Sequence, residues 1–239
     1  MAFDPHLIVE YAPLLGEGLW MTLRIVVAAF IVGYALGLIV ALVSLLPGRL
    51  PRAGVALYGT ILRGVPFIIV LFCVYYGLPF AGIRLPAFVV GTLALAIFNS
   101  AYYAEIIRAA IVALPRGQFE SARAVGMSPA QAMWHIIGPQ ILRSLVPPST
   151  NMTLTMIKES SVLSSITVGE LTYQGLVMQG NTYAPIECFV AVGGIYWGVC
   201  AVVSWLSVRL ERRVGLAQAA QINRNRLAAS FLSFERPRS

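Results

Sequence analysis

The sequence predicts an all-α integral membrane protein with five transmembrane helices. Three observations predict this class. Hydrophobic residues make up 58% of the chain and charged residues only 11%, whereas a soluble domain averages about 45–50% apolar and about 25% charged residues. The apolar residues form long blocks, and a helix needs about 20 residues to cross a bilayer. Finally, Lys and Arg are concentrated in every second segment between those blocks, as in a chain that crosses a membrane repeatedly.

The first three predicted spans are predominantly apolar and cover residues of about 19–46, 54–78 and 87–107. The first span would reach roughly 42 Å as a helix, so it must tilt or begin in the headgroup region. Residues 1–18 contain Asp4, Glu10 and Glu17 but no Lys or Arg. They therefore lack the basic start of a signal peptide. We expect a periplasmic N-terminal segment followed by a retained span.

The fourth predicted span, about 144–165, is unusually polar, and the fifth covers about 186–208. A charge at the centre of a bilayer costs about 2.5–3.5 kcal/mol on insertion scales. A helix with so many polar groups must therefore face a partner, a cavity or a pore. Its polar and helix-breaking residues are Pro147, Pro148, Asn151, Thr153, Thr155, Lys158, Glu159, Ser160 and Ser161.

The distribution of basic residues predicts the orientation. Segments 1–18, 79–86 and 166–185 contain one basic residue, Arg84, whereas segments 47–53, 108–143 and 209–239 contain thirteen. Basic loops remain in the cytoplasm. The N-terminus is therefore expected outside, the C-terminus inside, and residues 209–239 as a cytoplasmic basic tail.

Other functions are disfavoured by what the sequence contains. The net charge of +7 is explained by topology, and no polar region alternates basic with aromatic residues, so nucleic acid is not an expected partner. Three cysteines lie in apolar stretches without a C-x-x-C pair, and the two histidines, His6 and His135, lie outside the spans. We therefore expect neither a metal site nor an intramembrane enzyme. The only lysine, Lys158, follows Met156 and Ile157, so no phosphate-binding G-x-x-x-x-G-K-[ST] loop exists.

The cytoplasmic segment 108–143 is too long for a simple connection and contains signals for two short helices. The first is predicted over 117–125 and ends at Gly126, the second begins with Ser128 as its cap and Pro129 at its first position, and Gly138 with Pro139 is expected to end it. Such a loop would expose four large apolar side chains: Phe119, Met127, Met133 and Trp134. They could contact another protein or fold back against the membrane.

This segment resembles the cytoplasmic signature of ABC importer permeases, which is Glu-Ala-Ala, three residues, Gly, nine residues, Ile, one residue and Leu-Pro. Here the pattern is Glu120-Ser121-Ala122, Gly126, Ile136-Ile137 and Gly138-Pro139, with the spacing kept and with Ser121 and Gly138 as departures. Further stretches look like the polar-amino-acid branch: Gly117-Gln118, Arg63-Gly64-Val65-Pro66, Ala104-Glu105 with Arg108, and Lys158-Glu159-Ser160-Ser161-Val162-Leu163. The resemblance covers about residues 18–211.

The resemblance implies an ABC type-1 transmembrane domain over residues 19–208 in the bacterial inner membrane, with 108–143 as the loop that couples to the ATPase. The implied coupling residues are Gly117, Glu120, Ala122, Gly126, Ile136 and Pro139. The implied partners are ABC ATPase subunits, a periplasmic solute-binding protein, and a second permease subunit in a homodimer or heterodimer, all surrounded by lipid. ATP would bind to the partner subunit, and this chain would need no cofactor.

A path for the solute is predicted along the fourth span. Asn151, Thr155 and Lys158 are four and three residues apart and therefore share one helix face. Glu159, Ser160 and Ser161 flank that face, and Asn99 and Tyr103, with Tyr102, are expected to face the same space from the third span. A cation and an anion together suit a zwitterionic amino acid. Alternatively, Lys158 and Glu159 neutralise each other or snorkel, although adjacent helical residues point about 100° apart.

A second hypothesis is an ion-coupled secondary transporter or channel that works alone. It explains the charges inside the membrane equally well. It does not explain the two-helix loop, and it predicts internal repeats that the sequence does not show.

Two further patterns predict local contacts only. Glu105 and Arg108 are expected to form an i,i+3 ion pair, and Gly33 with Gly37 a G-x-x-x-G site of close helix packing.

Overall fold

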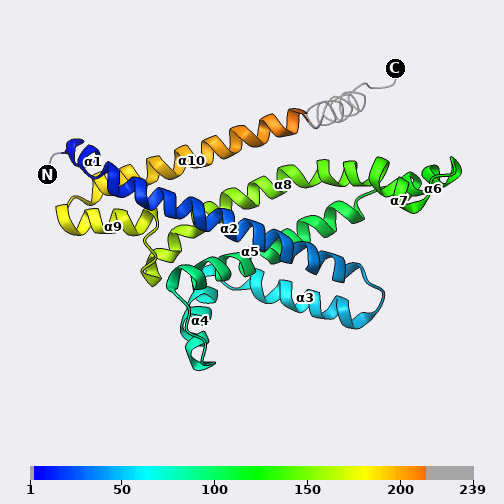
Figure 1. Cartoon of the computed structure of the whole chain (residues 1–239), viewed down its shortest axis with the longest axis horizontal. Coiled ribbons are helices and arrows are strands. Elements are labelled where there is room, and N and C mark those ends of the chain that lie inside the picture. The colour runs from blue at the N-terminus through cyan, green and yellow to red at the C-terminus, as the bar shows by residue number, and fades with distance from the viewer. Residues whose placement is uncertain (1–2, 214–239) are drawn as a thin grey trace, which may run out of the picture.

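The computed structural model describes residues 3–213, apart from the side chains of Arg116 and Arg213, and every regular element in that range is helical. This confirms the all-α class (Figure 1). Predictions for residues 214–239 of the basic tail lie outside the described residues. The elements are α1 (His6–Glu10), α2 (Ala12–Leu45), α3 (Arg49–Gly64), α4 (Phe67–Phe80), α5 (Ala87–Val112), α6 (Arg116–Ala124), α7 (Pro129–Ala132), η1 (Met133–Ile137), α8 (Gly138–Glu159), η2 (Ser160–Ile166), α9 (Leu171–Thr182) and α10 (Pro185–Arg213).

Helix α5 lies at the centre of the bundle and packs most extensively against α2. The two helices approach closely because two glycines of α2 leave room for the α5 backbone. A Cβ added at Gly33 would lie 2.8 Å from the carbonyl oxygen of Ala96, and one at Gly37 would lie 2.8 Å from Cβ of Tyr103. The predicted G-x-x-x-G packing site is therefore confirmed. Around it, α3, α4 and α8 also pack against α5.

The second predicted span, 54–78, is wrong as a single helix. Helices α3 and α4 are separate and meet at an angle of 105°, so that α4 projects from the body of the bundle (Figure 1). The chain breaks at Val65, whose backbone is extended (φ −116°, ψ 137°), and at Pro66. Proline disfavours the helical conformation of the residue before it and cannot donate a backbone hydrogen bond. Because apolar residues lie on both sides of this break, hydropathy alone predicts a single span over residues 54–78.

Helix α8 begins earlier than the predicted fourth span, and its last predicted turns form the 3₁₀ helix η2. The serines of this segment explain the change, because their hydroxyls donate to carbonyls three residues earlier. Ser160 donates to Ile157 at 2.7 Å, and Ser161 to Lys158 at 2.7 Å. Such local bonds compete with the α-helical pattern and favour the tighter turn. Thr167, with φ 61°, then ends the segment.

The predicted outer loop 166–185 contains a helix, α9, that the sequence analysis did not predict. Glu170 caps it by accepting bonds from the backbone N–H groups of Thr172 at 2.9 Å and Tyr173 at 2.8 Å. The same carboxylate accepts a bond of 2.8 Å from the Tyr196 hydroxyl of α10. Helix α9 also packs against α2. This end of the bundle is therefore a packed layer rather than an open loop.

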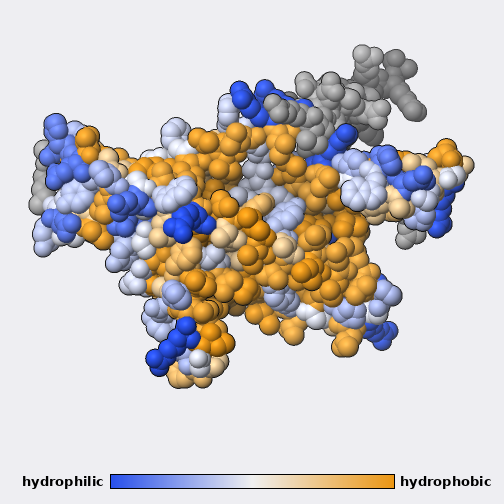
Figure 2. Space-filling model, viewed as in Figure 1, coloured by the Kyte–Doolittle hydropathy of each residue, from blue (hydrophilic) through white to orange (hydrophobic). Residues whose placement is uncertain are grey.

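Three of the described helices, α2, α5 and α10, are long and apolar enough to cross a bilayer, and the bent pair α3–α4 would make a fourth. Helix α2 begins at Ala12, before the predicted start of the first span at Leu19. Helices α1 and α9 lie at one end of the molecule and α6 and α7 at the other (Figure 1). Figure 2 shows apolar surface over the middle of the body and hydrophilic residues at these ends, as expected of a membrane protein.

We predict that Gly33→Ala destabilises the protein, whereas Gly16→Ala in the same helix does not. The added methyl group at Gly33 would press on backbone, which cannot move aside without separating α2 from α5, at a cost of about 1–3 kcal/mol. A Cβ at Gly16 meets nothing within 4 Å. Reversible unfolding in mixed detergent micelles would measure both free energies. Equal effects of the two substitutions would contradict the close-packing account.

Candidate functional site

A polar stripe runs along the exposed side of α8. Its members are spaced by four, three, four and three residues, which keeps them on one face: Ser144, Pro148, Asn151, Thr155 and Lys158, all exposed. The Thr155 hydroxyl donates to the carbonyl of Asn151 at 3.1 Å. The predicted alignment of Asn151, Thr155 and Lys158 on one face is therefore observed. Nothing else in the described chain covers this stripe, so it is available to water, solute or another subunit.

Glu159 turns away from the stripe and is half-buried against α5. The Nδ2 group of Asn99 donates to Glu159 Oε2 at 3.2 Å and to the Leu95 carbonyl at 2.9 Å. Asn99 is fully buried, and its Oδ1 atom has no partner among the described residues. Lys158 and Glu159 do not pair with each other. Among the described side chains, the only ion pair joins Arg108 to Glu105 at 2.6 Å. Asn99 thus positions the carboxylate beside the stripe.

Tyr103 does not share this space, which corrects the expectation from the sequence. Its hydroxyl lies 3.1 Å from that of Thr153, and its ring packs against Phe30 and Tyr34 of α2 with centroid distances of 5.8 and 5.1 Å. Thr153 and Thr155 are two residues apart, so they point about 200° apart around α8. Tyr103 therefore contacts the side of α8 opposite the stripe. The rotation of α5 relative to α8 determines which side of α8 Tyr103 contacts, and residue spacing within α5 does not reveal that rotation.

The two serines of the predicted path have different places. Ser160 is fully buried and Ser161 is half-buried. Both donate to backbone carbonyls of their own segment, so they stabilise the 3₁₀ turn described above. Of the predicted path residues, the structure thus brings Asn151, Thr155 and Lys158 together on one surface, with Glu159 and Asn99 behind it.

Apart from the stripe, a polar cavity of about 470 Å³ lies between α2, α3 and α5. Arg52, Arg63 and Arg108 line it with Glu105, which accepts two bonds from Arg108 at 3.1 and 2.6 Å. The predicted Glu105–Arg108 pair is confirmed, but the sequence analysis did not predict that Arg52 and Arg63 lie beside it. Residue spacing in α3 could have indicated this, because one face of that helix carries Arg52, Ala56, Gly59 and Arg63 at intervals of four, three and four residues.

The predicted helix–glycine–helix motif is present between α5 and α8. Gly126 has φ 79°, a left-handed conformation that other residues adopt at a cost, and Met127 N–H bonds to the Ala122 carbonyl at 3.0 Å across it. Ser128 and Gln131 form a reciprocal capping box at the start of α7. Ala122, Ala132 and Ile137 are buried between the two helices. This small core makes the segment a compact unit, which we call the knob (residues 113–137).

The predicted end of the second knob helix is wrong. Instead of ending at Gly138 and Pro139, the chain passes through the π-helical turn η1 into α8. A wider π turn removes the i−4 carbonyl from the proline ring. Gly138 permits this turn, because a Cβ there would lie 2.7 Å from the Met133 carbonyl oxygen. Pro139 then stands in the first turn of α8, where proline is tolerated.

The outer surface of the knob is apolar in part. Trp134 is 79% exposed, Val125 75% and Phe119 46%. Gly117 and Glu120 are also exposed, whereas Ala122 is buried and Ile136 is half-buried. Exposed apolar side chains at the polar end of the molecule are typical of a protein-binding surface.

Comparisons with known proteins agree with this architecture. The sequence profile of the family described as "Binding-protein-dependent transport system inner membrane component" matches residues 33–216. The chain is 35% identical over 202 residues to the probable glutamine ABC transporter permease protein GlnM of Bacillus subtilis (strain 168), covering 82% of this chain and 93% of that protein. It is 32% identical over 216 residues to the glutamine transport system permease protein GlnP of Escherichia coli (strain K12), with 90% and 99% covered.

A solved structure shares the fold. The crystal structure of an amino acid ABC transporter with histidines contains a chain that matches with a TM-score of 0.82 and 38% identity, covering 89% of this chain and all of that chain. These matches favour the permease hypothesis over a transporter or channel that works alone. The chain therefore belongs to the family of binding-protein-dependent transport system inner membrane components, as a multi-pass permease subunit of the polar amino-acid ABC importer type.

Proposed function

We propose that this subunit forms half of the translocation path for a polar amino acid or a related small solute, and that a separate ATPase subunit supplies the energy. The observation that carries this proposal is the exposed polar stripe of α8, with the cation Lys158 uncovered on a helix that we propose to cross the membrane. Intramembrane charges are costly, and they are kept where they face a pore or a partner. A stripe that nothing in residues 3–213 covers needs a second wall, which a second permease subunit would provide.

The groups of the stripe suit a zwitterion. The Lys158 ammonium would attract the solute carboxylate, and Glu159, held by Asn99, would attract the solute ammonium. Asn151 and Thr155 offer hydrogen bonds to a polar side chain. Relatives named for glutamine, arginine and L-cystine transport support this class of solute.

We further propose five spans, with α3–α4 as one broken span and α8 as the fourth, the N-terminus outside and the C-terminus inside. The basic residues support this topology because 13 of the 17 lie in segments 47–53, 108–143 and 209–239, whereas the segments on the opposite side contain only Arg84. The knob would dock onto the ATPase through Phe119, Val125 and Trp134, while a periplasmic binding protein would deliver the solute at the opposite end.

Co-purification from the native membrane in mild detergent tests the assembly. We expect mass spectrometry to identify an ABC ATPase, a solute-binding protein, and either one permease sequence or two. Reconstituted vesicles should then take up a radiolabelled polar amino acid only with ATP. Replacement of Lys158 by Ala should lower uptake at least tenfold, whereas Val202→Ala on the exposed apolar side of α10 should not. Uptake without any ATPase would contradict the proposal.

Cysteine labelling tests whether the stripe faces water. In a variant lacking Cys73, Cys188 and Cys200, single cysteines at Asn151, Thr155 and Lys158 should react with a membrane-impermeant thiol reagent in the reconstituted protein, because thiolates form in water. A cysteine at Ile31, which is 62% exposed on α2, should not react if lipid covers it. Labelling rates would be compared by mass spectrometry. Equal protection at all positions would show that the stripe is buried in lipid or protein.

The knob is tested at its hinge. Gly126→Arg, and likewise Gly126→Asp, should abolish ATP-coupled uptake while the protein still inserts, since a side chain at φ 79° costs about 1–2 kcal/mol and distorts the junction of the two helices. Gly54→Arg is the matched control, because Gly54 is exposed on α3 and a Cβ there meets nothing within 4 Å. Normal uptake by the Gly126 variants would exclude the coupling role.

A further inference from the structure

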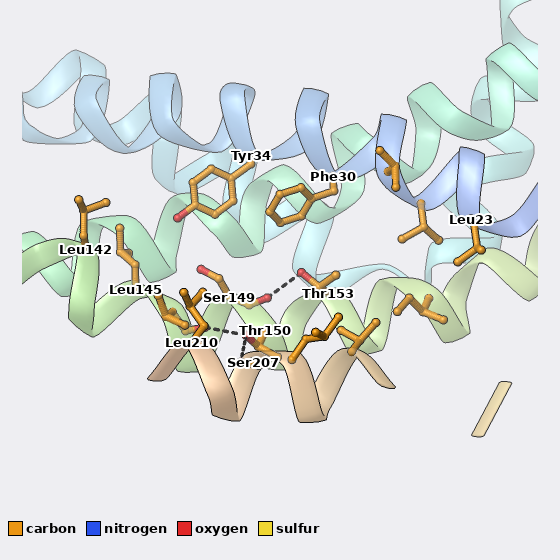
Figure 3. Close-up of a pocket in the computed structure, with 16 residues that line it drawn as sticks. Leu23, Phe30, Tyr34, Leu142, Leu145, Ser149, Thr150, Thr153, Ser207 and Leu210 are labelled. Carbon is orange, nitrogen blue, oxygen red and sulfur yellow. Dashed lines mark hydrogen bonds between the residues drawn. The ribbon is translucent and has the colours of Figure 1, made fainter. Parts of the chain in front are cut away.

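An apolar groove of about 510 Å³ lies between α2, α8 and α10, away from the proposed solute path (Figure 3). Helix α8 forms its floor, with α2 and α10 as its walls. Most polar groups in it are already bonded: the Thr150 and Ser207 hydroxyls lie 2.6 Å apart, and Thr153 donates to the Ser149 carbonyl at 2.8 Å. Only the Ser149 hydroxyl is buried without a partner among the described residues. The groove therefore suits an apolar occupant.

The groove and the polar stripe lie on opposite sides of α8. Ser149 lines the groove and Asn151 belongs to the stripe. Because they are two residues apart in a helix, their side chains point about 200° apart. The walls are open on the outside, since Val27 of α2 is 57% exposed and Leu206 of α10 is 53% exposed. If the stripe faces the solute path, the groove faces away from it, toward the hydrocarbon of the membrane.

One end of the groove is basic. Leu142, Leu145 and Leu210 line that end (Figure 3), and Arg143 and Arg209 are their neighbours in the chain. The Arg209 guanidinium lies 3.8 Å from the centroid of the Trp205 ring, which holds it beside the apolar wall. Arg212 is exposed near the same end. One carboxylate is also present there, that of Glu211, which accepts from Ser207 at 3.3 Å. With three arginines and one glutamate the formal charge of this end is +2.

The dimensions of the groove match one lipid chain. Its α2 wall extends from Leu23 to Tyr34, a rise of roughly 17 Å, about half of the 30 Å hydrocarbon core. An empty groove would forfeit dispersion contacts on all its walls. A lipid chain suits an open apolar groove of this length, and the basic end beside it favours an anionic headgroup over the apolar helix of a second subunit.

We infer that the groove binds one acyl chain of an anionic phospholipid, whose phosphate lies beside Arg143 and Arg209. This site goes beyond the proposed transport function, because it lies on the face of α8 opposite the solute stripe. Lipid selectivity would come from the basic end, since each arginine near a membrane surface favours an anionic headgroup by about fivefold. The apolar walls alone would not distinguish one phospholipid from another.

The experiment uses the full importer complex in phosphatidylcholine vesicles that contain a small fraction of phosphatidylglycerol with a diazirine in one acyl chain. After irradiation, peptide mass spectrometry maps the labelled residues. We expect labelling at Val146 and Leu206 to exceed, several-fold, labelling at Ile39 and Val202, which are 58% and 57% exposed but do not line the groove. Unlabelled phosphatidylglycerol should compete for the groove positions more strongly than phosphatidylcholine. Equal labelling at all four positions would overturn the inference.

Two variants separate the apolar and basic parts of the site. Val146→Phe should fill the groove and reduce its labelling to the level at Ile39, whereas Val202→Phe should not. The pair Arg143→Gln and Arg209→Gln should lower the preference for phosphatidylglycerol at least tenfold, whereas Arg49→Gln with Arg123→Gln removes the same charge elsewhere and should leave it unchanged. A photo-crosslinking residue at position 146 that captures a polypeptide, whether a second subunit or residues 214–239, would also overturn the inference. None of these measurements depends on uptake, so failure of the lipid site and failure of the transport proposal are distinguishable.

Discussion

The close approach of α2 and α5 at Gly33 and Gly37 is the contact on which the rest of the bundle depends. In a membrane no hydrophobic effect drives helices together, so association relies on close packing. Because α5 also carries α3, α4 and α8, the α2–α5 contact sets the frame in which α8 is held. The position of Asn99 on α5 then determines where the Glu159 carboxylate lies.

Helix α8 shows how one helix in a bilayer serves two environments. Its polar side is left uncovered by the described part of the chain, while its opposite side, with Ser149 and Thr153, forms the floor of an apolar groove. On the groove side of α8, the hydroxyls of Thr150 and Thr153 are bonded to backbone or to another hydroxyl, which lets them lie against apolar neighbours at little cost. Only the Ser149 hydroxyl on that side has no partner among the described residues.

Much of this arrangement follows from local sequence signals, and the rest depends on tertiary placement. Gly126, the Ser128 cap and the Gly33–Gly37 pair act through their own backbone geometry, so the sequence predicted them. The break at Val65–Pro66 was missed because hydropathy does not change across it. The continuation through Gly138 was missed because two ordinary helix-ending residues are accommodated by a π turn. The burial of Tyr103 and the groove could not be predicted, because both depend on how neighbouring helices are rotated and spaced.

The π turn η1 has a mechanical consequence. Because Met133–Ile137 leads into α8 without a loop, the knob and the helix that carries Lys158 form one continuous helical shaft. From Met133 to Lys158 this shaft rises roughly 37 Å, longer than the hydrocarbon core is thick. Under the proposed coupling role, a push or twist applied at the knob would therefore pass along this helix to the polar stripe.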